Sequence, residues 1–205
     1  MPDPEITLYG LNISGHVHRA VLMLEMLGLP YTYVETSVES RAAPDFLAIN
    51  PLGQVPVLRD GDVIIADSNA ILIYLVARYA PDGDWLPRDP VGAAHVQRWM
   101  SIAAGELRYG PALARAIKLL GLPLDPEPPR ALAKKLFGVM DAHLANRSFL
   151  VADRATLADI ALYSYTAHAP EGDVSLDSSP AIRAWLARVE ALPGFVPMSR
   201  IGKAD

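Results

Sequence analysis

The hydrophobic pattern of this chain changes once, at residues 80–90, and this change constrains the fold more than any other feature. Before it, short β-branched and aromatic runs alternate with stretches of helical spacing, whereas only helical spacing recurs after it. Residues 80–90 are rich in Pro, Asp and Gly, a composition typical of a linker. We therefore predict a mixed α/β domain over residues 1–80 and an all-helical domain over residues 91–205.

The first domain is predicted to have the element order β-α-β-α-β-β-α. The expected strands are residues 6–10, 31–34, 55–58 and 63–65, and the expected helices are 18–27, 44–49 and 68–79. The first two strands can lie parallel because a helix connects them, whereas Asp60-Gly61 predicts a hairpin between the last two. Arg19 is expected on the polar side of the first helix.

The second domain is predicted to be a helical bundle. Helical spacing extends over residues 91–120, 129–145, 157–167 and 181–192. Thr156 and Asp159 have the spacing of a capping box, with Asp in the place usually held by Glu or Gln.

Composition excludes several classes of function. The chain has 205 residues, of which 51% are hydrophobic and 20% charged, as in an ordinary globular protein. A net charge of -5 without a Lys/Arg cluster argues against binding to nucleic acid or an anionic membrane. The acidic start does not resemble a secretory signal, and the most apolar stretch, residues 70–76, is shorter than the ~20 residues that a bilayer requires. We expect a cytoplasmic protein.

The chain contains no cysteine, which limits its chemistry more than any other count. Disulfides, thiolate metal sites and a catalytic cysteine of this chain are excluded. If sulfur chemistry occurs here, the sulfur must arrive with a ligand. No metal site is predicted.

Pro56 lies between two valines in an expected strand, where proline cannot donate a backbone hydrogen bond. It is either an edge-strand proline or part of a cis peptide that turns the chain and presents the Val55 backbone to an extended peptide. Taken alone, the edge-strand interpretation is favoured, because cis occurs in only ~5–6% of X-Pro bonds.

Asp67 and Ser68 open a helix directly after a strand. The helix start and the Ser68 hydroxyl can hold a carboxylate, and Asp67 can hold an ammonium, so the pair suits the α-amino-acid end of a zwitterion. The alternative is simple capping of the helix, which is favoured when the pair is considered alone.

Ser14 lies just before the first predicted helix, where a bound thiol would experience the helix dipole and accept a hydrogen bond from the hydroxyl. Both effects favour thiolate over thiol. Lowering a thiol pKa of ~8.5 by ~2 units requires ~2.7 kcal/mol, which one hydrogen bond to a charged group can supply at ~1.5–3 kcal/mol. The alternative is again a helix cap.

Together these segments resemble the signature of the cytosolic glutathione transferases, especially the bacterial, theta-like, serine-type members. The matching residues are Asn50-Pro51-Leu52-Gly53-Gln54-Val55-Pro56-Val57-Leu58, then Asp67-Ser68-Asn69-Ala70-Ile71, with Leu157-Ala158-Asp159-Ile160 downstream. The resemblance extends from residue 6 to about residue 195 and implies a thioredoxin-like first domain followed by a helical domain.

The resemblance also implies how glutathione is held. Pro56 would be cis, and the Val55 backbone would pair with the cysteinyl part of glutathione. Asp67 and Ser68 would hold its γ-glutamyl end. Gln54, and with it Arg41, would lie near the glycine carboxylate.

The residue that activates the thiol is expected to be Ser14, with Tyr9 as the alternative, because family members use Tyr, Ser or Cys for this purpose. A second, hydrophobic substrate would lie between the domains; its expected neighbours are Asn12, His16, Trp99, Ala103 and Leu107. The alternative for the bundle residues is that they pack the core.

Two functions remain open at this level. The first is a glutathione transferase that conjugates the activated thiol to a small hydrophobic electrophile or uses it to reduce a peroxide. The second is a non-catalytic binding or stress-related module, because a fold does not fix a function. The family is usually a homodimer, and we expect one here.

Overall fold

The computed structural model describes residues 5–199. They form two compact units, one of residues 5–83 with 193–199 and the other of residues 84–192. The division after Gly83 falls inside the predicted linker. The last residues differ from the predicted boundaries, since the segment from Pro193 returns to the first unit. It does so because His18 Nε2 lies 2.9 Å from the carbonyl oxygen of Val196 and thereby ties this segment to the first helix.

The first unit contains a four-stranded mixed sheet in the order β2-β1-β3-β4. The strands are β1 (Ile6–Gly10), β2 (Tyr31–Glu35), β3 (Val57–Asp60) and β4 (Val63–Ala66). β1 pairs in parallel with β2 and antiparallel with β3, and β3 pairs antiparallel with β4. This confirms the predicted mixed sheet and its hairpin. β3 begins two residues later than expected.

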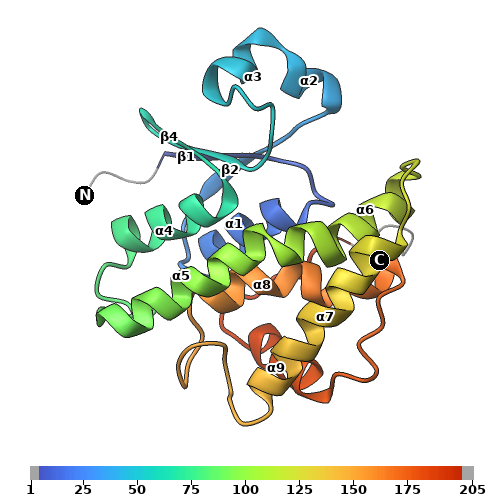
Figure 1. Ribbon diagram of the computed structural model, residues 1–205. Helices are drawn as coiled ribbons and strands as arrows, with labels where there is room; N and C mark the ends of the chain where they lie inside the picture. The colour runs from blue at the N-terminus through green and yellow to red at the C-terminus, as the bar shows by residue number, and fades with distance from the viewer. Residues whose placement is uncertain (1–4, 200–205) are drawn as a thin grey trace. The chain divides into compact units, whose positions relative to one another are not determined.

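Helices cover both faces of this sheet (Figure 1). They are α1 (Gly15–Met26), α2 (Val38–Ala42), α3 (Pro44–Ile49) and α4 (Ser68–Tyr79). α1 begins three residues earlier than predicted, because Ser14 caps it. The short α2 was not predicted; its apolar spacing is weak, and a capping box between Ser37 and Ser40 starts it.

Successive residues of β1 point to opposite faces of the sheet, so they identify the face that lies against α1. Gly10 is on the α1 face, because a side chain there would meet Val17 Cγ1 at 2.5 Å. Asp60 is on the same face and accepts hydrogen bonds from Tyr74 and Tyr79 of α4. Burial and these contacts with Asp60 raise the pKa of Tyr79 to about 12.

The prediction that Arg19 lies on the polar side of α1 is wrong. The residue is only 1% exposed. α4 packs against α1, and Arg19 Nη1 donates a hydrogen bond to the Ser68 hydroxyl at its start. Helical spacing identifies the two sides of a helix, but a second helix can cover a side that carries a charge.

The second unit is helical, as predicted. Its helices are α5 (Pro90–Ala104), α6 (Leu113–Leu120), α7 (Glu127–Leu144), α8 (Leu157–Ala167) and α9 (Pro180–Glu190), with a π-helical turn at Arg108–Ala112 and a 3₁₀ turn at Ala169–Gly172. The single helix expected over residues 91–120 is therefore interrupted. Pro111 has no N–H to donate, and Gly110 lies against the backbone of Ala133 in α7, so the helix widens there.

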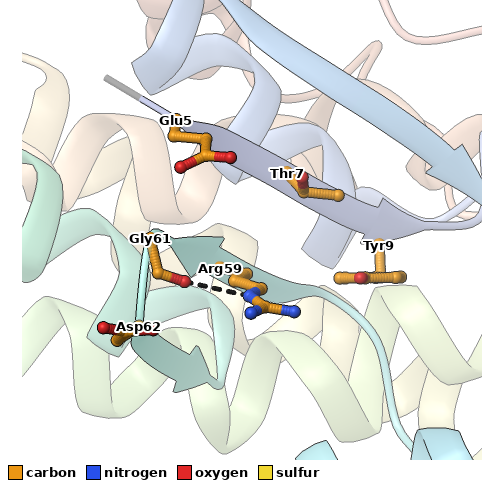
Figure 2. A pocket seen from close by; sticks show the side chains of 6 residues that line it. All are labelled: Glu5, Thr7, Tyr9, Arg59, Gly61 and Asp62. Carbon is orange, nitrogen blue, oxygen red and sulfur yellow. Dashed lines mark hydrogen bonds between the residues drawn. The ribbon is translucent and has the colours of Figure 1, made fainter. Parts of the chain in front are cut away.

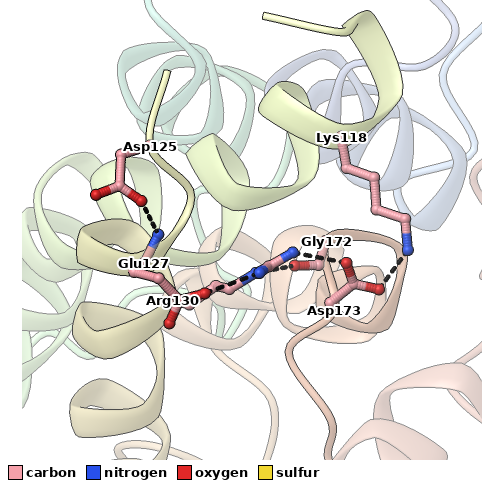
Figure 3. Close-up of polar contacts among 6 residues, drawn as sticks. All are labelled: Lys118, Asp125, Glu127, Arg130, Gly172 and Asp173. Atoms are coloured by element: carbon pink, nitrogen blue, oxygen red, sulfur yellow. Dashed lines mark hydrogen bonds and ion pairs between the residues drawn. The ribbon is translucent and has the colours of Figure 1, made fainter. Parts of the chain in front are cut away.

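Charged side chains fasten the 3₁₀ turn and the residue after it to α6 and α7 (Figure 3). Asp173 pairs with Lys118 of α6 and, at 2.6 Å, with Nη2 of Arg130 of α7. Arg130 Nε also donates to the carbonyl oxygen of Gly172 at 3.2 Å. Among the described residues, no helix has the length and apolar character needed to cross a bilayer.

Candidate functional site

Strand register brings three separate sequence segments to one edge of the sheet. Val57, the first residue of β3, pairs with Tyr9 near the end of β1. Val57 also pairs with Ala66, the last residue of β4. The residues that follow β1, precede β3 and follow β4 therefore meet at this edge. These are the segments that contain Ser14, Val55-Pro56 and Asp67-Ser68.

Ser14 is the N-cap of α1. Its Oγ accepts a hydrogen bond from the backbone N–H of Val17 at 3.4 Å, and its carbonyl oxygen accepts the N–H of His18 at 2.9 Å. The side chain is half-buried at the positive end of the helix dipole. Because Oγ accepts from Val17, the hydroxyl proton can point outward, toward an acceptor in front of the helix.

Tyr9 points away from α1. It alternates with Gly10 on β1, and its ring packs edge-on against Phe46 of α3, with 6.2 Å between ring centroids. Figure 2 shows Tyr9 with Thr7 and Arg59, which line a pocket of about 370 Å³ together with Glu5, Gly61 and Asp62. Tyr9 thus lies on the opposite face of the sheet from the helix that Ser14 caps.

Asp67 caps α4 and remains exposed. Its Oδ1 accepts from the N–H groups of Asn69 and Ala70 at 2.9 and 3.0 Å. Its backbone φ is +83°, a conformation that costs a residue with a Cβ about 1–3 kcal/mol. Strained backbone of this kind concentrates at ligand sites. Ser68 follows at the first helical position, is 3% exposed, and accepts a hydrogen bond from Arg19.

The loop before β3 has the expected cis peptide between Val55 and Pro56. Gln54 is exposed, and its carbonyl oxygen accepts from Asn50 Nδ2 at 2.8 Å. Gly53 has a φ of +62°, and the backbone carbonyl of Arg41 lies 3.3 Å from the position of a Cβ at Gly53. The backbone of Arg41 therefore lies close to Gly53, the residue before Gln54.

The residues expected to contact a hydrophobic substrate differ in their exposure to solvent. Asn12 is exposed, with its N–H 3.3 Å from Glu35 Oε1, and His16 is half-buried on the first turn of α1. Trp99, Ala103 and Leu107 are at most 1% exposed. Trp99 packs edge-on against His143, so the core-packing interpretation of these three residues gains support.

Arg19 is the site-adjacent residue that sequence reasoning missed. It comes from α1, reaches Ser68 of α4 and lies beside His16. A signal was present: Arg19 follows Ser14 by five residues and so projects from the same first turns of α1. No group of three or more His, Asp or Glu side chains that could hold a metal ion is found in residues 5–199.

Comparison with known proteins agrees with this geometry. Residues 8–83 match the glutathione S-transferase N-terminal domain, and residues 129–193 match the C-terminal domain of the same family. Glutathione S-transferase 3 of Zea mays is 32% identical over 203 residues, which cover 93% of this chain and 91% of the maize protein. Glutathione S-transferase GstB of Escherichia coli K12 is 32% identical and covers 92% of this chain and 94% of its own length.

A solved structure shows the same fold. The crystal structure of a glutathione transferase homologue from Drosophila mojavensis with bound glutathione has a TM-score of 0.83. It is 30% identical, and the match covers 93% of this chain and 89% of that one. The chain described here belongs to the glutathione S-transferase family, with a thioredoxin-like first unit and a helical second unit.

Proposed function

We propose that this protein binds glutathione, stabilises its thiolate through Ser14, and transfers that thiolate to a small hydrophobic electrophile. The observation that carries the proposal is the meeting of Ser14, Val55-Pro56 and Asp67-Ser68 at one edge of the sheet. Family membership supports glutathione as the co-substrate. We also expect a cytoplasmic homodimer, as is usual for the family.

Each part of glutathione has a proposed partner. The Asp67 carboxylate attracts the ammonium of the γ-glutamyl group, and Ser68 donates to its carboxylate. The Val55 backbone pairs with the cysteinyl part. Gln54 and Arg41 hold the glycine carboxylate. This arrangement fixes the peptide at both ends, so that its thiol lies in front of α1.

Ser14 is proposed to act by stabilising charge. Its hydroxyl donates to the thiolate while the dipole of α1 favours the negative charge, so that the thiol pKa falls from its usual ~8.5. A hydrogen bond to a charged group is worth ~1.5–3 kcal/mol, enough for a fall of about 1–2 units. At neutral pH this raises the fraction of glutathione present as the nucleophile. The thiolate then forms a bond to the electrophilic carbon and displaces its leaving group.

The test is glutathione conjugation to 1-chloro-2,4-dinitrobenzene, an activated aryl halide that releases chloride. We expect Ser14→Ala to lower kcat by about 100-fold, as the loss of one donor to a developing negative charge does elsewhere. Thr32→Ala, which removes an exposed hydroxyl from β2, serves as the control and should leave kcat unchanged.

A wild-type protein that binds glutathione but conjugates neither this halide nor other electrophiles, and reduces no peroxide, would contradict the enzyme. The binding-module interpretation would then replace it.

A further inference from the structure

The face of the sheet opposite α1 has a pocket whose walls are polar. Glu5, Thr7 and Tyr9 alternate along β1 and the residue before it, so their side chains lie on this face. Thr7 is the cross-strand partner of Arg59 in β3. Together with Asp62, in the turn between β3 and β4, these residues line the pocket of about 370 Å³ described above.

The charges of the pocket are divided between two ends. The acidic end is formed by the carboxylates of Glu5 and Asp62. The donor end is formed by the Arg59 guanidinium and the hydroxyls of Thr7 and Tyr9. Figure 2 shows Thr7 and Arg59 between the two carboxylates and Tyr9. Because a strand rises about 3.3 Å per residue, Glu5 is about 7 Å from Thr7 along β1 and about 13 Å from Tyr9.

The polar groups of the two ends are not paired with one another. Arg59 Nε donates to the carbonyl oxygen of Gly61 at 2.9 Å, which leaves both Nη nitrogens available. In the part of the chain that the structure describes, no ion pair joins Arg59 to a carboxylate of the acidic end. The two hydroxyls of the donor end have no hydrogen-bond partner there either. The pocket thus presents donors and acceptors that a ligand can use.

The arrangement of these groups restricts the ligand. A simple anion would be repelled by the two carboxylates, and a simple cation would leave the guanidinium without a partner, so the ligand needs both charges. In an α-amino acid the nitrogen is only about 2.5 Å from the carboxylate carbon, too close to reach both ends. A second residue extends this distance to about 6 Å, which is similar to the separation of Glu5 and Thr7 along the strand.

We propose that this pocket binds a dipeptide with free termini, its ammonium at the acidic end and its carboxylate at the donor end. The planar guanidinium of Arg59 can hold the carboxylate through two parallel hydrogen bonds, and the hydroxyls add further donors. The site is separate from the proposed glutathione site, because none of the residues proposed to hold the three parts of glutathione lines it. Each of the two proposals therefore stands or fails without the other.

The experiment titrates the full chain with glycylglycine and three relatives that each lack one feature. N-acetylglycylglycine lacks the ammonium, glycylglycinamide lacks the carboxylate, and glycine lacks the length. Shifts of the backbone amide signals in two-dimensional NMR give each Kd and locate the bound probe. The variants are Arg59→Gln and Asp62→Asn. The matched controls, Arg183→Gln in α9 and Asp153→Asn, remove exposed charges outside the pocket.

We expect glycylglycine to bind with a Kd of about 1 mM or below, to shift the amides of β1 and the β3–β4 turn, and to bind at least about threefold more tightly than each relative. Arg59→Gln should weaken glycylglycine by about three- to fivefold, the range of an exposed ion pair, but should not weaken glycylglycinamide. Asp62→Asn should weaken glycylglycine by about two- to threefold, because Glu5 remains, but should not weaken N-acetylglycylglycine. Both controls should match the wild type.

Three results would overturn the inference. Equal binding of the four probes, or no shift with about 10 mM glycylglycine, would mean that this face is only a hydrated surface. Equal losses of glycylglycine and glycylglycinamide in Arg59→Gln would show that Arg59 does not hold the carboxylate. Shifts confined to Ser14 and Val55 would place the dipeptide in the proposed glutathione site. The amide spectrum shows whether each variant is folded; if Arg59→Gln is not, the four probes and Asp62→Asn decide.

Discussion

Ser14 and Asp67 each cap a helix with one oxygen atom and retain further hydrogen-bonding capacity. Ser14 Oγ accepts from Val17 N–H and can still donate its proton, and Asp67 uses Oδ1 for the cap and has a second carboxylate oxygen. The sequence left capping and ligand binding as alternatives. At the residue scale they are compatible, because the cap aims the remaining polar atoms outward from the helix start.

Asp67 allows the two roles to be separated. We expect Asp67→Asn to keep the cap, so that the free energy of unfolding falls by less than about 1 kcal/mol, while glutathione affinity falls by about tenfold because the ammonium loses its charged partner. Asp67→Ala should lose affinity and also about 0.5–2 kcal/mol of stability, because the cap disappears. Urea denaturation and calorimetry measure the two effects. Equal stability of the two variants would contradict the capping role.

Most of the predicted site residues are polar residues at the ends of helices and strands. Such ends can be recognised in a sequence by capping residues and turns. Arg19 could not be found this way. Within α1 it is spaced with the buried Leu22 and Met23, but a charged residue is assigned to the polar side by type, and its contact with Ser68 depends on how α4 lies against α1. Such a contact is set by the packing of two helices that are about fifty residues apart in the chain, and local periodicity does not encode it.

At the scale of elements, one buried carboxylate organises the start of α8. Asp159 Oδ1 accepts from the Leu150 N–H at 2.9 Å and from Trp185 Nε1 at 2.8 Å. Its Oδ2 accepts from the N–H of Thr156 at 2.8 Å and from its hydroxyl at 3.1 Å. The capping box predicted from sequence is confirmed, and it also holds α9 through Trp185.

Asp159→Asn should therefore be costly although it is nearly isosteric. The amide nitrogen would face donors and leave them unpaired in the core, so we expect the free energy of unfolding to fall by about 2–4 kcal/mol. Urea denaturation measures this, with Asp153→Asn in the exposed loop before α8 as the control. A loss of less than about 0.5 kcal/mol would show that the four hydrogen bonds contribute little.

The ionised carboxylate of Glu171 stabilises the 3₁₀ turn, and this stabilisation depends on pH. Burial tends to raise the pKa of Glu171, but hydrogen bonds from His168 at 2.7 Å and Arg115 at 2.6 Å, with the charge of Arg115, lower it below its ordinary 4.5. A lowered folded pKa means that the stabilisation is present above the unfolded pKa and is lost as pH falls through the folded value.

We expect Glu171→Gln to cost about 1–3 kcal/mol at neutral pH, because the charged Arg115 and the His168 ring remain buried without the carboxylate that accepts from them. The difference from the wild type should shrink as pH is lowered below 4.5. Glu127→Gln is the control, since Glu127 is exposed and pairs with Arg130 near the surface. A difference that stays constant with pH would contradict an ionised Glu171 as the anchor.

At the scale of the whole molecule, the hydrophobic pattern of the sequence predicted a mixed α/β unit with its sheet and an all-helical unit. It could do so because alternation and helical spacing are local properties of the sequence. Two features were missed. The break between α5 and α6 has a local cause in Pro111, which has no N–H to donate, and a distant one in the approach of α7 at Gly110. The assignment of residues 193–199 to the first unit depends on contacts with α1, which lies far away in sequence.

The returning segment can be tested with two glycines of similar backbone. Gly194 has a φ of +76°, and a Cβ there would lie 2.7 Å from the carbonyl oxygen of Glu25. Gly121 has a φ of +62° with nothing within 4 Å of its Cβ position. Gly121→Ala should cost about 1 kcal/mol through the backbone alone, and Gly194→Ala should cost more, by about 1–3 kcal/mol. Equal melting temperatures would contradict the packing of this segment on α1.

The central claim is that Ser14 ionises the thiol of bound glutathione. It is tested most directly by titrating the protein with glutathione at neutral pH and following the ultraviolet absorption of the thiolate, with Ser14→Ala and Tyr9→Phe in parallel. The account predicts a thiolate band in the wild type and in Tyr9→Phe, and its loss in Ser14→Ala. A band lost only in Tyr9→Phe would move the role to Tyr9, and no band in the wild type at saturating glutathione would contradict the transferase itself.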